Sequence, residues 1–402
     1  MTATQVEATE VVGGADTHAD TVHVAAIDTV GRPLGDAEFP TTPAGYQAAL
    51  AFMAAFGPVL VIGIEGTSSY GAGLARAAAA AGIEIREVTR PDRAQRRMRG
   101  KSDPIDAYQA ALAAMSGRAD AAPKGTSIDA VRALHIARRS AVKAKTAAIN
   151  QIHQMLIIAP DPVREKYRGL KDKRLVDALA GCRPGTQDPT TRAVLTSLKT
   201  LAQRYQFLTR QADDLEDQLR DLARAQNPHL LSVRGVGPNT AAQLLITAGG
   251  NPDRLRSEAS FAALCGTAPV PASSGKTTRH RLSRGGDRAA NHALHTIATV
   301  RMSFDPRTRD YVARQRHAGR TDKEILRLLK RALAREIFRS LTRDLSAPEL
   351  ADLRPTRQTK NITLATAAAA MGTYVSKIVR TELGTYPDYE LATRYREWLN
   401  AA

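Results

Sequence analysis

The sequence predicts an α/β domain at the N-terminus followed by mainly helical regions, and three observations support this fold class. Short strand-like runs lead into an alternation of helical and strand patterns before residue 120. A heptad repeat of apolar residues then covers residues 194–222. Beyond it, the helical segments are strongly basic. We expect four parts, which are residues 1–120, 121–228, 229–346 and 347–402.

The first part is expected to contain a mixed sheet. The expected strands cover residues 11–18, 21–28, 33–39, 59–65 and 83–88. The expected helices cover residues 43–56, 71–81 and 104–115. Tight turns separate the early strands, which favours antiparallel pairing. The uninterrupted apolar run over residues 59–65 is typical of a buried parallel strand.

Two carboxylates open the last of these helices. Asp103 is the expected N-cap and Pro104 the first helical residue, where a missing N–H costs nothing. Asp106 follows one turn later, so both carboxylates share a helix face near its positive end. Such a pair can bind Mg²⁺ if carboxylates from other elements converge on it. The alternative is that Asp103 only caps the helix and Asp106 only complements its dipole.

Two further acidic residues lie on the strands of the same part. Asp16 is in the first strand, and Glu65 ends the central one. Ligands of open α/β sheets gather at the C-terminal ends of strands. A single glutamate at a strand end is more often a solvated residue, but here it is the fourth member of a set.

The sequence is strongly basic and contains few cysteines. Its 57 basic and 40 acidic residues give a net charge of +17, which favours a polyanion as partner. Cys182 and Cys265 lie far apart without the spacing of a zinc site, and a disulfide framework is not supported. No apolar run is long enough to span a membrane, and the acidic N-terminus does not resemble a signal peptide. We expect a cytoplasmic protein.

Asp16, Glu65, Asp103 and Asp106, together with the sequence Lys-Ser-Asp-Pro-Ile-Asp-Ala, resemble the DEDD tetrad of one class of insertion-sequence transposases. These enzymes are relatives of the pilin-gene invertases and include the bridge-RNA-guided recombinases. The resemblance implies an RNase H-like, or RuvC-like, fold in which the four carboxylates bind Mg²⁺. Two metal ions about 4 Å apart can stabilise both the attacking and the leaving oxygen of a phosphodiester. It also implies a bacterial protein that associates with the nucleoid.

A run of basic residues precedes the second pair of carboxylates. Its members are Arg90, Arg93, Arg96, Arg97, Arg99 and Lys101. Charge runs are usually solvated surface. Beside a nuclease centre, we expect phosphate contacts from Arg93, Arg96, Arg97, Arg99 and Lys101, which position nucleic acid without reading its sequence.

The middle part is predicted to be helical. Residues 126–158 form a long basic helix, and residues 160–189, broken by prolines and glycines, are expected to be irregular. The heptad seam over residues 194–222 predicts a coiled coil. Its partner is either the helix over residues 126–158 or a second subunit. We favour an antiparallel hairpin that also brings subunits together.

A glycine-rich turn opens the third part. Gly235 and Gly237 lie in the sequence Val-Arg-Gly-Val-Gly-Pro, which resembles a helix-hairpin-helix motif. Glycines let the backbone approach a phosphate, and the next helix offers free N–H groups. The same pattern also serves as an ordinary turn.

The stretch over residues 261–288 resembles the C-terminal domain of the same transposase family, in which a serine of a Ser-Gly turn is the nucleophile. That resemblance assigns the role to Ser274, with Ser273 as the alternative. Asp287 and Asn291 depart from the family pattern, which has asparagine and frequently arginine there. The cations expected to contact the phosphate are Lys276, Arg279, Arg281 and Arg284. Without the resemblance, this segment is a polar turn. Residues 289–300 and 322–345 are expected to be helices that support it.

The last part begins with a proline-containing linker over residues 347–361. Beyond it, Ala368, Gly372 and Ile378 have the spacing of a repressor-type helix-turn-helix. Gly372 makes the turn, and Ile378 packs the two helices together. The residues expected to face DNA are Ser376, Lys377 and Arg380. The alternative is a helical tail without this role.

The sequence therefore predicts a DEDD transposase or site-specific recombinase. The resemblance implies Mg²⁺, double-stranded DNA at the element ends and at the target, a structured guide RNA, and dimers that assemble into a tetramer. One alternative is a metal-dependent nuclease that resolves DNA junctions with water as the nucleophile. The other is a DNA-binding regulator without catalytic activity.

Overall fold

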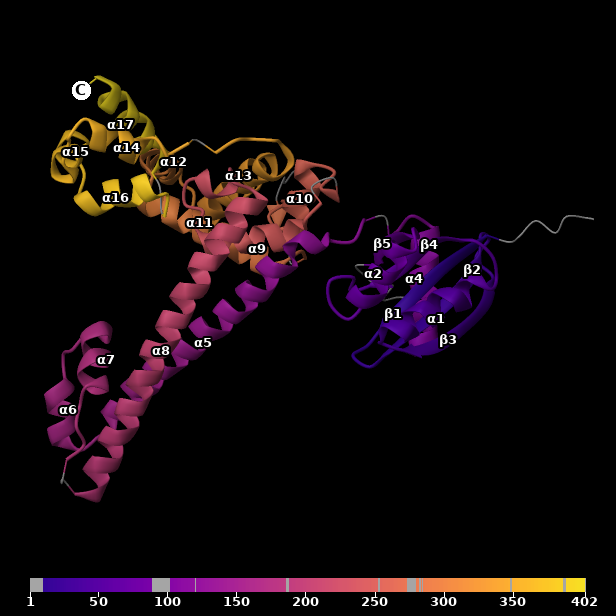
Figure 1. The fold of residues 1–402 in the computed structure, drawn as a ribbon, viewed down its shortest axis with the longest axis horizontal. Coiled ribbons are helices and arrows are strands. Elements are labelled where there is room, and N and C mark those ends of the chain that lie inside the picture. Colours follow the sequence, from indigo (N-terminus) through magenta and orange to yellow (C-terminus); the bar gives the residue numbers. More distant parts are fainter. Residues whose placement is uncertain are drawn as a thin grey trace, which may run out of the picture. The chain divides into compact units, whose positions relative to one another are not determined.

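The computed structural model describes residues 10–88, 102–119, 121–185, 188–251, 254–272, 280–281, 283, 285–347, 349–385 and 388–401. The chain divides into two compact units, Met1–Gly125 and Thr126–Ala402 (Figure 1). The finer division into four parts stays a prediction. Among the described residues, none of the helices is both long and apolar enough to cross a membrane.

The first unit is built on a mixed sheet of five strands. The strands are β1 Val11–Thr17, β2 Thr21–Asp28, β3 Pro33–Pro40, β4 Val59–Glu65 and β5 Glu84–Val88. Their order in the sheet is β3-β2-β1-β4-β5. β2 is antiparallel to β1 and β3, whereas β4 is parallel to β1 and β5. The predicted strands are confirmed, and the arrangement fits an RNase H-like α/β fold.

Helices cover both faces of this sheet. They are α1 Pro43–Ala54, α2 Ala72–Ala80 and α4 Asp103–Met115. Val11 and Ala15 pack with the buried residues of α1 and α2, whereas Val12 packs with Ala111 and Ala114 of α4. Successive strand residues point to opposite faces. The even-numbered residues of β1 therefore face α4.

The start of α4 differs by one residue from the prediction. Ser102, with extended dihedral angles of φ −151° and ψ 152°, is the N-cap, and Asp103 is the first helical residue. The N–H of Asp106 donates to the carbonyl oxygen of Ser102 over 3.0 Å, so the helical hydrogen bonds begin there. The prediction that Asp103 is the N-cap was therefore wrong. The carboxylates of Asp103 and Asp106 still lie in the first turn.

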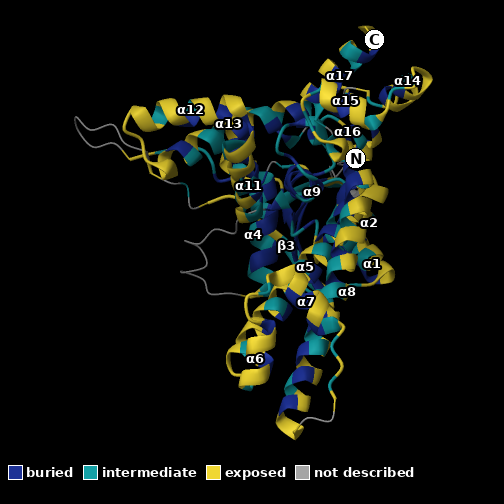
Figure 2. Cartoon of the chain, turned by 90° about the vertical axis from the view of Figure 1, so that its left-hand side faces the viewer, coloured by how far each residue is buried: buried dark blue, intermediate teal, exposed yellow. Residues whose placement is uncertain are grey.

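The second unit begins with a helical hairpin. Its elements are η1 Thr126–Ile128, α5 Asp129–Ile157, α6 Asp161–Tyr167, α7 Asp172–Ala180 and α8 Pro189–Gln226. α5 and α8 lie side by side and run antiparallel (Figure 1), because Val131 packs with Leu219 and Ile152 packs with Leu198. Buried residues recur along α8 (Figure 2), and those that belong to the predicted heptad seam are Leu198, Leu208, Ala212 and Leu219. The partner of the seam within the chain is thus α5.

Residues 160–189, which were expected to be irregular, contain α6 and α7. Pro160 is the N-cap of α6 and Pro162 lies in its first turn, where proline is tolerated. Val163 and Leu175 are buried against α5 and α8. The prediction was wrong because these prolines begin a helix and do not break one.

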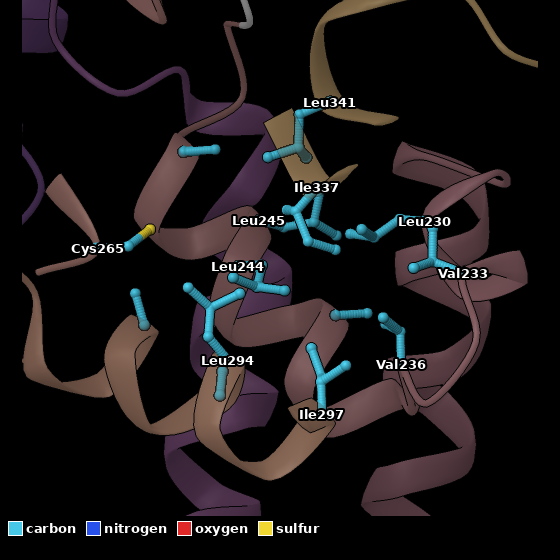
Figure 3. Packing of buried hydrophobic residues seen from close by; sticks show 14 of the residues in the cluster. Leu230, Val233, Val236, Leu244, Leu245, Cys265, Leu294, Ile297, Ile337 and Leu341 are labelled. Atoms are coloured by element: carbon cyan, nitrogen blue, oxygen red, sulfur yellow. The ribbon is translucent and has the colours of Figure 1, made fainter. Parts of the chain in front are cut away.

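The rest of the unit is mainly helical, with one short strand pair. Its elements are η2 Leu230–Ser232, α9 Pro238–Ala248, α10 Glu258–Leu264, β6 Val270–Pro271, β7 His280–Arg281, α11 Arg288–Phe304, α12 Pro306–His317 and α13 Asp322–Thr342. Leu244, Leu294 and Ile337 belong to the shared core of α9, α11 and α13 (Figure 3). The two predicted helices, here α11 and α13, are confirmed.

The chain ends in α14 Leu353–Thr359, α15 Leu364–Ala370, α16 Val375–Leu383 and α17 Tyr389–Ala401. α14 lies inside the stretch that was expected to be a linker. Pro355 is the third residue of α14 and lies in its first turn, where proline is tolerated. The predicted turn at Gly372 and the burial of Ile378 are confirmed, since Gly372 has a φ of +63° and Ile378 is fully buried.

Candidate functional site

Two of the predicted carboxylates lie on the sheet face that α4 covers. Asp16 and Glu65 follow Gly14 and Gly63 by two residues each, and Gly14 is paired with Gly63 across β1 and β4. Residues two apart on a strand share a face. Because β1 and β4 are parallel, their C-terminal ends meet at one edge of the sheet. Asp16 and Glu65 are therefore neighbours at that edge.

The two glycines let α4 approach the sheet closely. A Cβ atom on Gly14 would lie 2.1 Å from the carbonyl oxygen of Ala107, and one on Gly63 would lie 2.3 Å from that of Ala110. At such distances, a side chain at either position would force backbone atoms of α4 to move. Tyr108 also ties α4 to the sheet, because its hydroxyl donates to Asp36 Oδ1 over 3.0 Å. Burial, together with the Asp36 carboxylate, raises the pKa of Tyr108 to about 12.

The close approach brings Asp103 to Asp16, with His18 between them. His18 Nε2 lies 3.4 Å from Asp16 Oδ2 and 3.4 Å from Asp103 Oδ1. Ligand atoms of the three residues lie within 4.8 Å of one another. The Asp16 side chain is 11% exposed, whereas those of His18 and Asp103 are each 42% exposed. The group is thus open to solvent on one side.

The other two predicted carboxylates are Glu65, at the end of β4, and Asp106, on α4. The hydroxyl of Thr17 donates to the backbone oxygen of Glu65 over 3.1 Å, which fixes the end of β4 against β1. Asp106 is buried on α4, one turn after Asp103. Of the four predicted carboxylates, the structure brings Asp16 and Asp103 within ligand distance of each other.

His18 was not predicted as a site residue. It follows Asp16 by two positions, which places both on one face where β1 ends. The predicted site contains carboxylates alone, although an Asp-x-His pattern at a strand end is the local signal for a further ligand.

The donor set of this group fits a divalent cation. Carboxylate oxygens are the ligands of Mg²⁺ and Mn²⁺, and imidazole nitrogen binds first-row transition metals. Carboxylates from β1 and α4, with a histidine at the same edge, offer both kinds of donor. Asp16, His18 and Asp103 are therefore the residues that could hold a metal ion.

Several predicted nucleic-acid contacts lie outside the described residues. In the first unit these are Arg93, Arg96, Arg97, Arg99 and Lys101. In the second unit they are Lys276, Arg279 and Arg284, and both serines considered as nucleophile, Ser273 and Ser274, belong to the same group. Arg281 is described, in β7, and is exposed.

The segment that contains the serines is joined to described structure at both ends. β6 and β7 pair antiparallel, with Val270 opposite Arg281. Asp287 caps α11, accepts a hydrogen bond from the Thr247 hydroxyl over 2.6 Å, and donates its N–H to the Leu264 carbonyl over 2.6 Å. Asn291 Nδ2 donates to the carbonyl oxygens of Cys265 and Gly266. The two residues that depart from the family pattern therefore fix the turns next to this hairpin.

Cys265 lies in the same region, but its thiol is not expected to be reactive. Burial, together with the negative charge of Asp287, raises the pKa of its thiol to about 12. The thiol stays protonated at neutral pH, so Cys265 is no candidate nucleophile.

The turn with Gly235 and Gly237 is packed against other parts of the second unit. Gly235 has a φ of +79°, and a Cβ atom there would lie 3.3 Å from the Ile297 carbonyl oxygen of α11. Arg301 Nε donates to the Arg234 carbonyl over 2.7 Å. Gly237, the N-cap of α9, lines a cavity of about 270 Å³ with Arg220 and Arg224. Nucleic-acid binding by either glycine stays a prediction.

Of the three predicted contacts on α16, Ser376 and Arg380 are exposed. Lys377 Nζ instead lies 2.8 Å from Asp388 Oδ2. Its charge is therefore compensated within the protein. That Lys377 faces DNA stays a prediction.

Comparison with known proteins finds two family models that match separate segments of the chain. Residues 13–159 match a family model of DEDD transposases of the IS110 type, and residues 227–313 match the transposase family IS116/IS110/IS902. A relative in Streptomyces coelicolor, the insertion element IS110 uncharacterized 43.6 kDa protein, is 32% identical over 158 residues. This match covers 39% of the chain and 38% of the relative, so the chain matches less than half the length of that relative. Over these segments the chain is therefore similar to DEDD transposases of the IS110 type.

Proposed function

We propose that this protein is a DNA transposase that cuts and rejoins the ends of an insertion sequence. The observation that carries the proposal is the convergence of Asp16, His18 and Asp103 at the edge of an RNase H-like sheet. Matches to two transposase families support it. The net charge of +17 suits double-stranded DNA as substrate.

Asp16, Glu65, Asp103 and Asp106 are proposed to hold Mg²⁺, with His18 as a further ligand. The bound ion supplies Lewis-acid stabilisation of the charge that develops on phosphate oxygens. The protein contributes the positioning. Gly14 and Gly63 set the height of α4 above the sheet, and Thr17 fixes the end of β4. The open side of the group leaves room for a phosphodiester.

Ser274 is proposed as the nucleophile, with Ser273 as the alternative. Its oxygen forms a bond to phosphorus, the bond from phosphorus to a deoxyribose oxygen breaks, and the serine proton passes to solvent or a base while the leaving oxygen gains one. Attack by another deoxyribose hydroxyl reverses these changes and joins the new strand. The energy of the phosphodiester is retained in the phosphoserine link, so no external energy source is required.

A structured guide RNA and assembly of dimers into a tetramer complete the proposal. Both come from the family resemblance. The basic residues of the second unit suit RNA and DNA equally, so charge does not distinguish the two polymers.

A recombination assay tests this function. Full-length protein is incubated with Mg²⁺, RNA transcribed from the DNA flanking its gene, and plasmids that carry the element ends and a target, and new junctions are quantified. Asp103→Asn and Asp16→Asn are expected to abolish junctions, whereas Glu84→Gln, which removes an exposed carboxylate of the same unit, retains them. Junctions formed by Asp103→Asn at the wild-type rate would refute the carboxylate mechanism. Cleavage without junctions would favour the junction-resolving nuclease, and DNA binding without cleavage would favour the regulator.

A further inference from the structure

The last four helices form a module with a core of its own. Leu353 of α14, Ala368 of α15, Ile378 of α16 and Tyr395 of α17 are buried together. This module, which we define as α14–α17, lies outside the residues matched by both family models. Its role therefore does not follow from the family assignment.

Within the module, a short turn joins α15 and α16, as in a helix-turn-helix. α15 ends at Ala370 and α16 begins at Val375, with Gly372 in the left-handed region between them. The Thr373 N–H donates back to the Ala368 carbonyl over 2.9 Å, which closes the turn. A short turn with glycine and an apolar contact between the helices is the signature of this motif.

A buried ion pair joins the inward face of α16 to α14. Arg357 Nε lies 2.6 Å from Glu382 Oε1, and the Tyr395 hydroxyl donates to the same oxygen over 2.8 Å. The Arg357 and Glu382 side chains are only 10% and 3% exposed. Three helices are thus fixed around Glu382. The opposite face of α16 points outward as a rigid surface.

That outward face carries the chemistry of a DNA reader. Ser376 and Arg380 are exposed, and so are Tyr374, Val375 and Leu383. An arginine can bind guanine through two hydrogen bonds in the major groove, a serine can donate or accept, and apolar side chains contact the methyl group of thymine. Residues near the start of the second helix are the ones that reach base edges in this motif.

The charges of the module also favour a polyanion. Four acidic residues have ion-pair partners, namely Asp352 with Arg396, Glu382 with Arg357, Asp388 with Lys377, and Glu390 with Arg234 outside the module. Among the described residues of α17, Glu397 is exposed without an ion pair. Within the described part of the module, the exposed cations without an ion pair are Arg354, Lys360, Arg380 and Arg394. The module therefore carries exposed cations without an ion pair, one of which, Arg380, lies on α16.

We propose that α14–α17 is a module that reads the sequence of double-stranded DNA, with α16 in the major groove and Arg380 and Ser376 at base edges. This site is separate from the carboxylate group. The inference goes beyond the proposed function and does not rest on it, because it needs neither the metal nor the serine.

The test selects duplexes from a random pool with the full chain, in EDTA so that no cleavage takes place. Affinity for the selected duplex is then compared with affinity for a scrambled duplex at one salt concentration. Arg380→Ala is expected to weaken binding of the selected duplex by about tenfold, the loss of a good arginine–guanine contact, while the scrambled duplex changes much less. Ser376→Ala is expected to change which sequence is preferred. Arg174→Ala on α7 removes the same charge from an exposed position and serves as the control.

Asp103→Asn separates this inference from the proposed function. The variant is expected to bind the selected duplex like the wild type even if recombination is lost or never observed. Equal loss of affinity for both duplexes in Arg380→Ala, or no enrichment of any duplex, would overturn the inference. Preferential binding of structured RNA through α16 would overturn it as well. Far-ultraviolet circular dichroism of each variant shows that the helices are intact.

Discussion

Gly14 of β1 and Ala107 of α4 meet backbone to backbone. A Cβ atom on Gly14 would lie 2.1 Å from the Ala107 carbonyl oxygen and 2.3 Å from the Ala111 amide nitrogen. The contact lies on the strand face that carries Asp16 and beneath the helix that carries Asp103. The position of α4, and with it the distance between the two carboxylates, depends on the absence of a side chain at Gly14.

Gly14→Ala is expected to destabilise the first unit by about 1–3 kcal/mol or more, because backbone atoms of α4 must move. It should also weaken metal binding, since Asp103 moves with the helix. Chemical denaturation and Mn²⁺ titration measure the two effects. Gly13→Ala is the control for metal binding, because its Cβ atom would meet the buried Met53 and Ile62 side chains on the other face of the sheet, away from α4. Unchanged metal affinity in Gly14→Ala would contradict the positioning role.

His18→Ala is expected to lower Mn²⁺ affinity by at least about tenfold, a loss seen even for hydrogen-bond partners of metal ligands. The effect on Mg²⁺ should be smaller, because Mg²⁺ prefers oxygen donors. Electron paramagnetic resonance of free Mn²⁺ measures the affinity for Mn²⁺. Competition of Mg²⁺ with bound Mn²⁺ measures the affinity for Mg²⁺. His153→Ala, at an exposed histidine of α5 that pairs with Asp172, should bind Mn²⁺ normally. If His18→Ala and His153→Ala bound Mn²⁺ with the same affinity, His18 would not be a metal ligand.

Arg357→Ala is expected to destabilise the C-terminal module by about 3–5 kcal/mol, because it leaves the Glu382 carboxylate buried without its partner. Hydrogen exchange measured by mass spectrometry should show faster exchange in α14–α17 than in α9 or α11. Arg396→Ala breaks the more exposed pair with Asp352 and should have a smaller effect. If exchange in the module stayed at the wild-type rate after Arg357→Ala, the ion pair would not be what holds α16.

The first unit could be predicted largely from its sequence because its signals are local. Apolar runs and tight turns fixed the strands, and Pro104 placed the start of α4 to within one residue. α6 and α14 were missed because Pro160, Pro162 and Pro355 were interpreted as breaks, whereas each lies at a helix start. The local sequence pattern does not distinguish a proline that ends a helix from one that lies at the start of a helix.

The site was predicted less completely, since it depends on contacts between distant residues. The local sequence pattern does not indicate that Asp388 pairs with Lys377 or that Arg234 pairs with Glu390. His18 was overlooked although it lies two residues from Asp16. Strand periodicity, applied to every potential ligand and not to carboxylates alone, would have found it.

The second unit is expected to lose stability in mild acid through His135. Burial, with the nearby charges of Arg139 and Arg138, lowers the pKa of His135 from 6.5. The unfolded chain therefore binds a proton more readily than the folded one, and the free energy of unfolding falls as the pH drops below about 6.5. Urea denaturation at several pH values measures this slope. His135→Gln should flatten it, whereas His153→Gln should not, and identical slopes in wild type and His135→Gln would contradict the assignment.

The most direct test of the central claim is a search for a covalent link between the protein and DNA. Full-length protein, Mg²⁺, candidate RNA and DNA of the element ends are mixed, stopped in detergent and separated on a denaturing gel. We expect a protein band whose migration is shifted by covalently attached DNA. This band should be absent in Ser274→Ala and in Asp106→Asn but present in Ser273→Ala. Cleaved DNA without any adduct would contradict this expectation, and would instead assign cleavage to water at the carboxylate site.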